Sequence, residues 1–124
     1  MEIRYRVSGM VIRGENQGKK LGFPTANIAL HENIPEGIYA AEVIVDSKSF
    51  HSATFVGAAK TFERTESNVE SYILDFSDDL YGQNITVNLF KKMRENKKFD
   101  SVEELITQMH SDIKEIRAFF EESK

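Results

Sequence analysis

The sequence predicts a mainly β domain, an antiparallel barrel or sandwich of six short strands followed by one long amphipathic helix. Three observations predict it. Six segments rich in β-branched and aromatic residues are each bounded by Gly, Asp, Asn or Ser, as strands joined by turns are. The connections between them lack the helical patterns that a parallel sheet requires. Only the last part of the chain repeats its apolar residues with the period of a helix.

The strands follow from residue patterns taken in order. Charged and apolar side chains alternate over residues 2–7, and apolar residues continue to position 12, which is typical of a half-buried strand. Pro24 excludes helical backbone just before it, so residues 23–30 are expected to be short and extended. Turn residues occupy positions 31–37. The remaining four strands are expected at residues 39–45, 49–56, 69–76 and 85–90.

The C-terminal segment has the start signal of a helix. Ser101 and Glu104 have the spacing of a capping box. From Val102 to Phe120 apolar residues recur at steps of one, three and four, which lines one face of a long helix. This face should pack against the strands.

Length and composition limit the class of protein. At 124 residues the chain fits a single domain covering residues 1–124. A net charge of −4 argues against a surface built for nucleic acid, and no apolar run approaches the length of a membrane span. The N-terminus lacks the pattern of a secretory signal, and the chain has no cysteine for a disulfide or a thiolate metal site. We therefore expect a cytoplasmic protein, monomeric, with no nucleic-acid or membrane partner.

A loop with the sequence GENQGKKLGFPTAN, residues 14–27, combines glycines with adjacent lysines. Its spacing matches neither the P-loop nor the dinucleotide-binding fingerprint. The same physics can still apply, because glycine lets backbone amides approach an anion and lysine supplies positive charge. The alternative is an ordinary flexible hairpin.

Thr25 and Asn27 lie two residues apart at the end of this loop. In an extended chain both side chains leave the same face. A hydroxyl and an amide oxygen on one face can ligate a hard cation such as Mg²⁺, which shares phosphate oxygens as further ligands. The alternative is the polar edge of a strand.

Several segments together resemble the riboflavin kinase (flavokinase) domain, as found in the C-terminal part of bacterial bifunctional riboflavin kinase/FAD synthetase. They are LGFPTAN, GIYAAEV, VESYILDF, DLYGQNITVNLFKKMRENKKF and SVEELITQMHSDI, in this order over about residues 6–120. The resemblance implies a six-stranded antiparallel, Greek-key-like β-barrel with a long C-terminal amphipathic α-helix. It also implies transfer of the ATP γ-phosphate to the 5′-hydroxyl of riboflavin, giving FMN and ADP, with Mg²⁺ as cofactor and Zn²⁺ or Mn²⁺ as alternatives.

The resemblance also implies roles for residues of the loop. Gly14, Gly18 and Lys19 would lie over the phosphates of ATP. Pro24 and Thr25 begin the PTAN motif, which would contact the nucleotide. Many bacterial relatives carry an adenylyltransferase domain ahead of the kinase. The sequence leaves open whether this is a natural single-domain kinase or a domain of a longer protein.

Four residues would carry the chemistry. By resemblance, Thr25 and Asn27 contact Mg²⁺ and phosphate, Glu70 is the general base, and Arg94 adds positive charge near the active site or clamps a mobile loop. The strand pattern places Glu70 on one face with Tyr72, so a salt bridge at the barrel rim is its alternative role. For Arg94 the alternative is a solvated face shared with neighbouring lysines.

One departure from the family pattern keeps a second function open. The turn at Ala59-Lys60-Thr61-Phe62 lacks the proline that the family usually has there. A catalytically weakened module that still binds flavin or nucleotide is therefore the alternative to an active kinase. A small barrel that binds single-stranded nucleic acid is a third possibility, and the acidic balance disfavours it.

Overall fold

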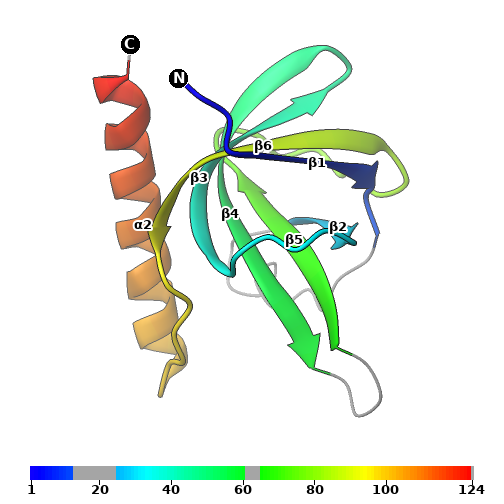
Figure 1. Ribbon diagram of the computed structural model, residues 1–124. Helices are drawn as coiled ribbons and strands as arrows, with labels where there is room; N and C mark the ends of the chain where they lie inside the picture. Colours follow the sequence, from blue (N-terminus) through cyan, green and yellow to red (C-terminus); the bar gives the residue numbers. More distant parts are fainter. Residues whose placement is uncertain (13–24, 61–64, 124) are drawn as a thin grey trace.

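The computed structural model describes residues 1–12, 25–60 and 65–123 of the chain. Six antiparallel strands form a nearly closed barrel, and one long helix stands beside it (Figure 1). The elements are β1 (Tyr5–Met10), β2 (Ala26–Leu30), β3 (Gly37–Val45), β4 (Lys48–Lys60), β5 (Thr65–Ile73), β6 (Asn84–Arg94) and α2 (Val102–Glu122). The barrel with a C-terminal helix that the sequence predicts is therefore confirmed.

The strands are ordered β1-β6-β3-β4-β5-β2 around the sheet, and these neighbouring strands all pair antiparallel within the described residues. Between the two end strands, a bridge joins Ile12 to Asn27, and the Ile12 amide donates to the Asn27 carbonyl at 2.8 Å. This bridge follows β1 directly and lies within β2. It therefore brings the two ends of the sheet together next to Asn27, so that the barrel is nearly closed.

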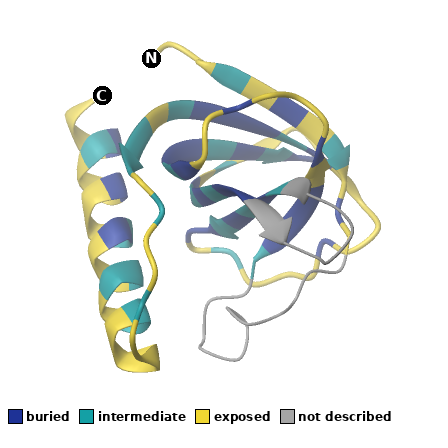
Figure 2. Ribbon diagram, turned by 60° about the horizontal axis from the view of Figure 1, so that its bottom comes forward, coloured by how far each residue is buried: buried dark blue, intermediate teal, exposed yellow. Residues whose placement is uncertain are grey.

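Two apolar cores share the strands between them. The first fills the barrel with side chains that alternate inward along each strand, among them Ile28, Val43, Val69, Val87 and Leu89, all fully buried. The second lies outside the barrel, where Ala40 and Leu74 meet Ile116 and Phe120 of α2. Figure 2 shows the buried positions of α2 facing the barrel and the exposed ones facing away.

The helix begins as its capping signal predicts. The Ser101 hydroxyl accepts a hydrogen bond from the Glu104 amide at 3.1 Å. The Glu104 carboxylate reaches back to the amide of Asp100, also at 3.1 Å, rather than to that of Ser101. The side chains at this end thus satisfy two amides that the helix itself cannot bond. Within the described part of the chain, no helix is long and apolar enough to cross a membrane.

The observed strands differ from the expected ones mainly in β4 and β5, which pair beyond the expected strand ends. The hairpin of β4 and β5 extends to the pair Lys60–Thr65, although its outer part is rich in residues that disfavour strands. Cross-strand hydrogen bonds override that local preference. At its other end β5 stops at Ile73, and Asp75 has a φ of 58°, which turns the chain. β6 continues to Arg94, four residues beyond the expected end.

Candidate active site

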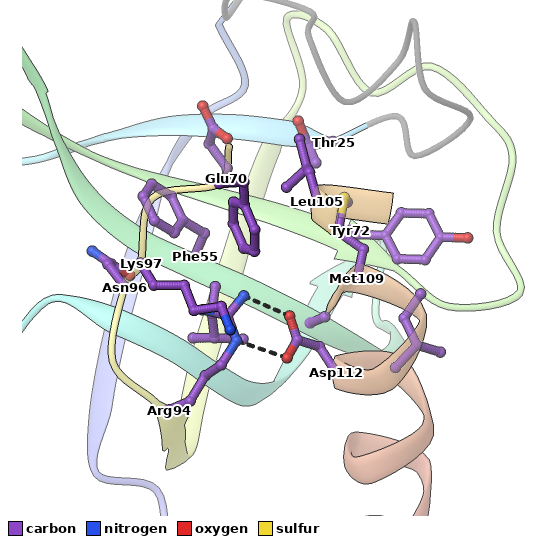
Figure 3. A pocket seen from close by; sticks show the side chains of 14 residues that line it. Thr25, Phe55, Glu70, Tyr72, Arg94, Asn96, Lys97, Leu105, Met109 and Asp112 are labelled. Atoms are coloured by element: carbon purple, nitrogen blue, oxygen red, sulfur yellow. Dashed lines mark hydrogen bonds and ion pairs between the residues drawn. The ribbon is translucent and has the colours of Figure 1, made fainter. Parts of the chain in front are cut away.

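A pocket of about 310 Å³ lies between the first half of α2 and the outer face of the barrel (Figure 3). Strands β3 to β6 supply one wall and α2 the facing wall. The connection from β6 to α2 lies between the two walls. The lining side chains are Thr25, Ile38, Ala53, Phe55, Glu70, Tyr72, Arg94, Asn96, Lys97, Phe99, Leu105, Met109, Asp112 and Ile113.

Strand register sets the neighbours of Glu70. It is directly opposite Asn27 of β2 on one side and Phe55 of β4 on the other. Directly opposed residues in an antiparallel sheet project from the same face. Since Val69 and Ser71 face the barrel interior, Glu70 and its two neighbours face outward, toward the pocket side. The strand alternation predicted for Glu70 is thereby confirmed.

Asn27 is buried yet incompletely hydrogen-bonded. Its Nδ2 lies 3.5 Å from the Thr25 hydroxyl and 3.4 Å from the Thr25 carbonyl, so the two side chains are adjacent, as their spacing predicts. Its side chain is 4% exposed, and its Oδ1 has no hydrogen-bond partner among the described residues. A buried acceptor without a partner costs about 1–3 kcal/mol, so this oxygen is suited to a cation or a donor supplied by a ligand.

The chemistry of this corner fits a hard divalent cation. The Asn27 and Thr25 oxygens are neutral, and the Glu70 carboxylate is on the neighbouring strand. Across residues 1–12, 25–60 and 65–123, no group of three or more His, Asp or Glu side chains is arranged to hold a metal. A cation bound at Thr25 and Asn27 would therefore need further oxygen ligands from water or a bound phosphate, as Mg²⁺ commonly takes.

The Glu70 carboxylate is half-buried and oriented by its own strand. Asn68, two residues earlier on the same face, donates to Glu70 Oε1 at 3.2 Å. Figure 3 shows the carboxylate of Glu70 and the side chain of Thr25 at the same end of the pocket. A carboxylate and a hydroxyl thus line the end of the pocket that adjoins β2 and β5.

Arg94 lies at the other end of the pocket and is engaged by the helix. Its Nε donates to Asp112 Oδ1 at 2.8 Å and its Nη2 to Asp112 Oδ2 at 2.7 Å, as the dashed lines in Figure 3 show. Its Nη1 donates to the Glu95 carbonyl at 2.9 Å. The Arg94 side chain is 20% exposed. The alternative expectation that Arg94 belongs to a solvated face is therefore wrong.

Sequence reasoning did not single out Asp112, Phe55 or Asn96, all of which line the pocket. A signal for Asp112 exists, because it interrupts the apolar face of the helix between Met109 and Ile116. A carboxylate at such a position requires a buried partner. The predicted phosphate-contacting residues Gly14, Gly18, Lys19 and Pro24 lie outside the described residues, as do Thr61 and Phe62 of the altered turn.

Comparison with known proteins decides the family. The family model for Flavokinase, riboflavin kinase, matches residues 1–120 of the chain. The chain belongs to the riboflavin kinase family.

Relatives of this family are similar over nearly the whole chain. The bifunctional riboflavin kinase/FMN adenylyltransferase of Listeria monocytogenes is 37% identical over 120 residues, covering 94% of this chain and 38% of that protein. The protein of the same name from Escherichia coli K12 is 35% identical over 119 residues, with the same coverage. The trifunctional protein RibF/MnmA of Mycoplasmoides gallisepticum is 37% identical, and the match covers 18% of it. The chain thus spans less than half the length of these curated relatives.

Solved structures agree with the riboflavin kinase fold. The riboflavin kinase of Trypanosoma brucei has a TM-score of 0.68 and 25% identity, covering 94% of this chain and 79% of that one. A structure described as a macrolide-efflux protein from Streptococcus pneumoniae has a TM-score of 0.83 and 33% identity, covering 90% of this chain and 38% of that one.

Proposed function

We propose that this domain is an active riboflavin kinase, which transfers the γ-phosphate of ATP to the 5′-hydroxyl of riboflavin and releases FMN and ADP. Family membership supports the reaction class. The observation in this chain that supports it most is that Thr25 and Glu70 line one end of a pocket with a largely apolar remainder, and that Asn27 lies next to both of them. A cytoplasmic location and action as a monomer belong to the same proposal.

The apolar part of the pocket suits a flat ring system. Phe55 and Tyr72 supply aromatic surface from the barrel, and Leu105, Met109 and Ile113 supply aliphatic surface from α2. Riboflavin combines a flat tricyclic ring with a flexible hydroxylated chain. With the ring between these two walls, the chain can extend toward Glu70, which places the terminal hydroxyl at the polar end.

Glu70 is suited to accept a proton from that hydroxyl. As the hydroxyl oxygen bonds to the γ-phosphorus, the bond from phosphorus to the β,γ-bridging oxygen breaks, ADP leaves, and the hydroxyl proton passes to the carboxylate. The hydrogen bond from Asn68 to Glu70 Oε1 orients the group.

Thr25 and Asn27 are suited to hold a divalent cation through the hydroxyl and the unpartnered Oδ1. Neutral oxygen donors favour Mg²⁺ or Mn²⁺ over Zn²⁺, which prefers nitrogen and sulfur. When bound, the cation would neutralise charge on the phosphates during transfer. Arg94 lies at the far end of the pocket with its charge paired to Asp112, so we assign it to the shape of the ring-binding end rather than to phosphoryl transfer.

Chromatographic detection of FMN tests this function. Purified domain with riboflavin, ATP and Mg²⁺ should produce FMN and ADP in equal amounts, and γ-labelled ATP should deliver its label to FMN. Parallel reactions with Mn²⁺ and Zn²⁺ rank the cations. Riboflavin binding without FMN formation in the presence of each of the three metals would contradict the kinase proposal. It would favour a catalytically weakened module that only binds flavin, an alternative that none of the structural observations supports.

A further inference from the structure

A partly buried ion pair joins α2 to the barrel inside the pocket. Arg94 is the last residue of β6, Asp112 lies near the middle of α2, and both side chains line the pocket. The two N–H···O contacts, of 2.8 and 2.7 Å, form a parallel fork between guanidinium and carboxylate. Bidentate pairs of this kind fix orientation as well as distance.

Both carboxylate oxygens of Asp112 accept hydrogen bonds from other side chains of the protein. Besides the fork from Arg94, its Oδ1 accepts a hydrogen bond at 2.9 Å from Gln108, one helical turn earlier. The Asp112 side chain is only 6% exposed. A desolvated carboxylate with three donors has little freedom to rotate, and removing its charge would leave the Arg94 guanidinium without its counter-charge.

The ion pair lies between two parts of α2 that have different roles, one attached to the barrel and one lining the pocket. The buried apolar contacts that attach the helix to the barrel come from its second half, through Ile116 and Phe120. Its first half presents Leu105 and Met109 to the pocket. Asp112 adjoins the attached half, at the point where the helix begins to act as a pocket wall.

We infer that Asp112 is a positioning residue, which holds the Arg94 guanidinium and the pocket-lining half of α2 at a fixed distance from the sheet and so sets the width of the ring-binding end. The inference rests on the proposed function for the identity of the ligand. A pocket whose width is already fixed is pre-organised, so the ligand does not have to order the helix when it binds.

The chain offers a matched control for this pair. Arg117 of α2 also makes two hydrogen bonds to a barrel carboxylate, that of Asp75, each of 3.1 Å. That pair is exposed, with side chains 50% and 77% accessible, and neither residue lines the pocket. The hydrogen bonds from Arg117 hold the pKa of Asp75 below its ordinary value, so the control carboxylate is ionised at neutral pH.

Riboflavin fluorescence titration of Asp112→Asn and Asp75→Asn tests the inference, with melting temperatures measured on the same samples. Asp112→Asn keeps the size of the side chain and removes its charge. We expect its riboflavin Kd and KM to rise about tenfold while kcat falls less than threefold, because the groups at the phosphoryl-transfer end are untouched. Asp75→Asn should leave Kd unchanged. Gln108→Ala removes the hydrogen bond from Gln108 to Asp112 and leaves the fork from Arg94 in place, so it should raise the riboflavin Kd by a smaller factor. This variant replaces Asp112→Asn in the test if Asp112→Asn does not fold.

The outcomes separate the two proposals. An unchanged Kd in Asp112→Asn, or in Gln108→Ala when only that variant folds, overturns the positioning role. An equal loss of affinity in Asp75→Asn also overturns it, because general docking of the helix would then explain the effect. A wild-type domain that binds riboflavin without making FMN overturns the kinase proposal alone, and one that does not bind riboflavin overturns both.

Discussion

Asn27 is unusual among the buried polar residues because its Oδ1 has no hydrogen-bond partner in the described part of the chain. The sequence predicts that it shares a face with Thr25, since alternate residues of an extended segment project to the same side. It does not predict that Asn27 lies opposite Glu70. That neighbour depends on the register between β2 and β5, which are separated by two other strands along the chain.

Replacement of Asn27 by alanine should separate a ligand-binding role from a structural one. We expect Asn27→Ala to raise the Mg²⁺ concentration for half-maximal activity about tenfold and to cost less than about 1 kcal/mol of stability, since an unpaired acceptor is removed. Mg²⁺ titration of FMN formation and urea unfolding measure the two effects.

Asn88 is the control for this substitution. It is equally buried, but its Oδ1 accepts from Arg6 at 2.8 Å and its Nδ2 donates to Glu42 at 3.0 Å. Asn88→Ala should therefore lose about 1–3 kcal/mol of stability and leave the Mg²⁺ dependence unchanged. If Asn27→Ala behaved in the same way as Asn88→Ala, Asn27 would be a structural residue.

Among the strands, β4 shapes the pocket through a glycine as well as through its side chains. A Cβ added at Gly57 would collide with the ring of Phe55, two residues earlier on the same face. The ring of Phe55 therefore rests over Gly57, and this position helps to form the aromatic wall of the pocket. The sequence shows a glycine directly after the strand expected at residues 49–56, but it does not show the ring that lies over this glycine.

Gly57→Ala should displace the Phe55 ring. We expect riboflavin KM to rise about fivefold with a stability loss of about 1 kcal/mol, because the ring must leave its present position. Steady-state kinetics and thermal unfolding measure both. Gly9→Ala is the control, since a Cβ there would meet Ile28 at an ordinary contact distance of 3.7 Å. An unchanged KM in Gly57→Ala would remove the Phe55 ring from the binding surface.

Over the whole molecule, local patterns predict the elements, and long-range pairing decides the site. The count of six strands, the terminal helix and its Ser101 cap follow from period, turn residues and capping chemistry, which act over a few residues. The register that places Asn27 opposite Glu70 and the fork between Arg94 and Asp112 depend on contacts between distant segments. For that reason the sequence identifies Glu70 and Arg94 as candidate site residues but does not show which residues lie beside them. Glu70 lies opposite Asn27, and Arg94 pairs with Asp112.

The central claim is that Glu70 accepts the proton of the attacking hydroxyl at the polar end of this pocket, and the rate of FMN formation in a single turnover tests it most directly. Glu70→Gln at saturating riboflavin and Mg²⁺-ATP should lower this rate by about 10²- to 10⁴-fold, with riboflavin Kd within threefold of wild type. Glu42→Gln, which alters another half-buried strand glutamate, should not change the rate. A wild-type rate in Glu70→Gln would contradict the account.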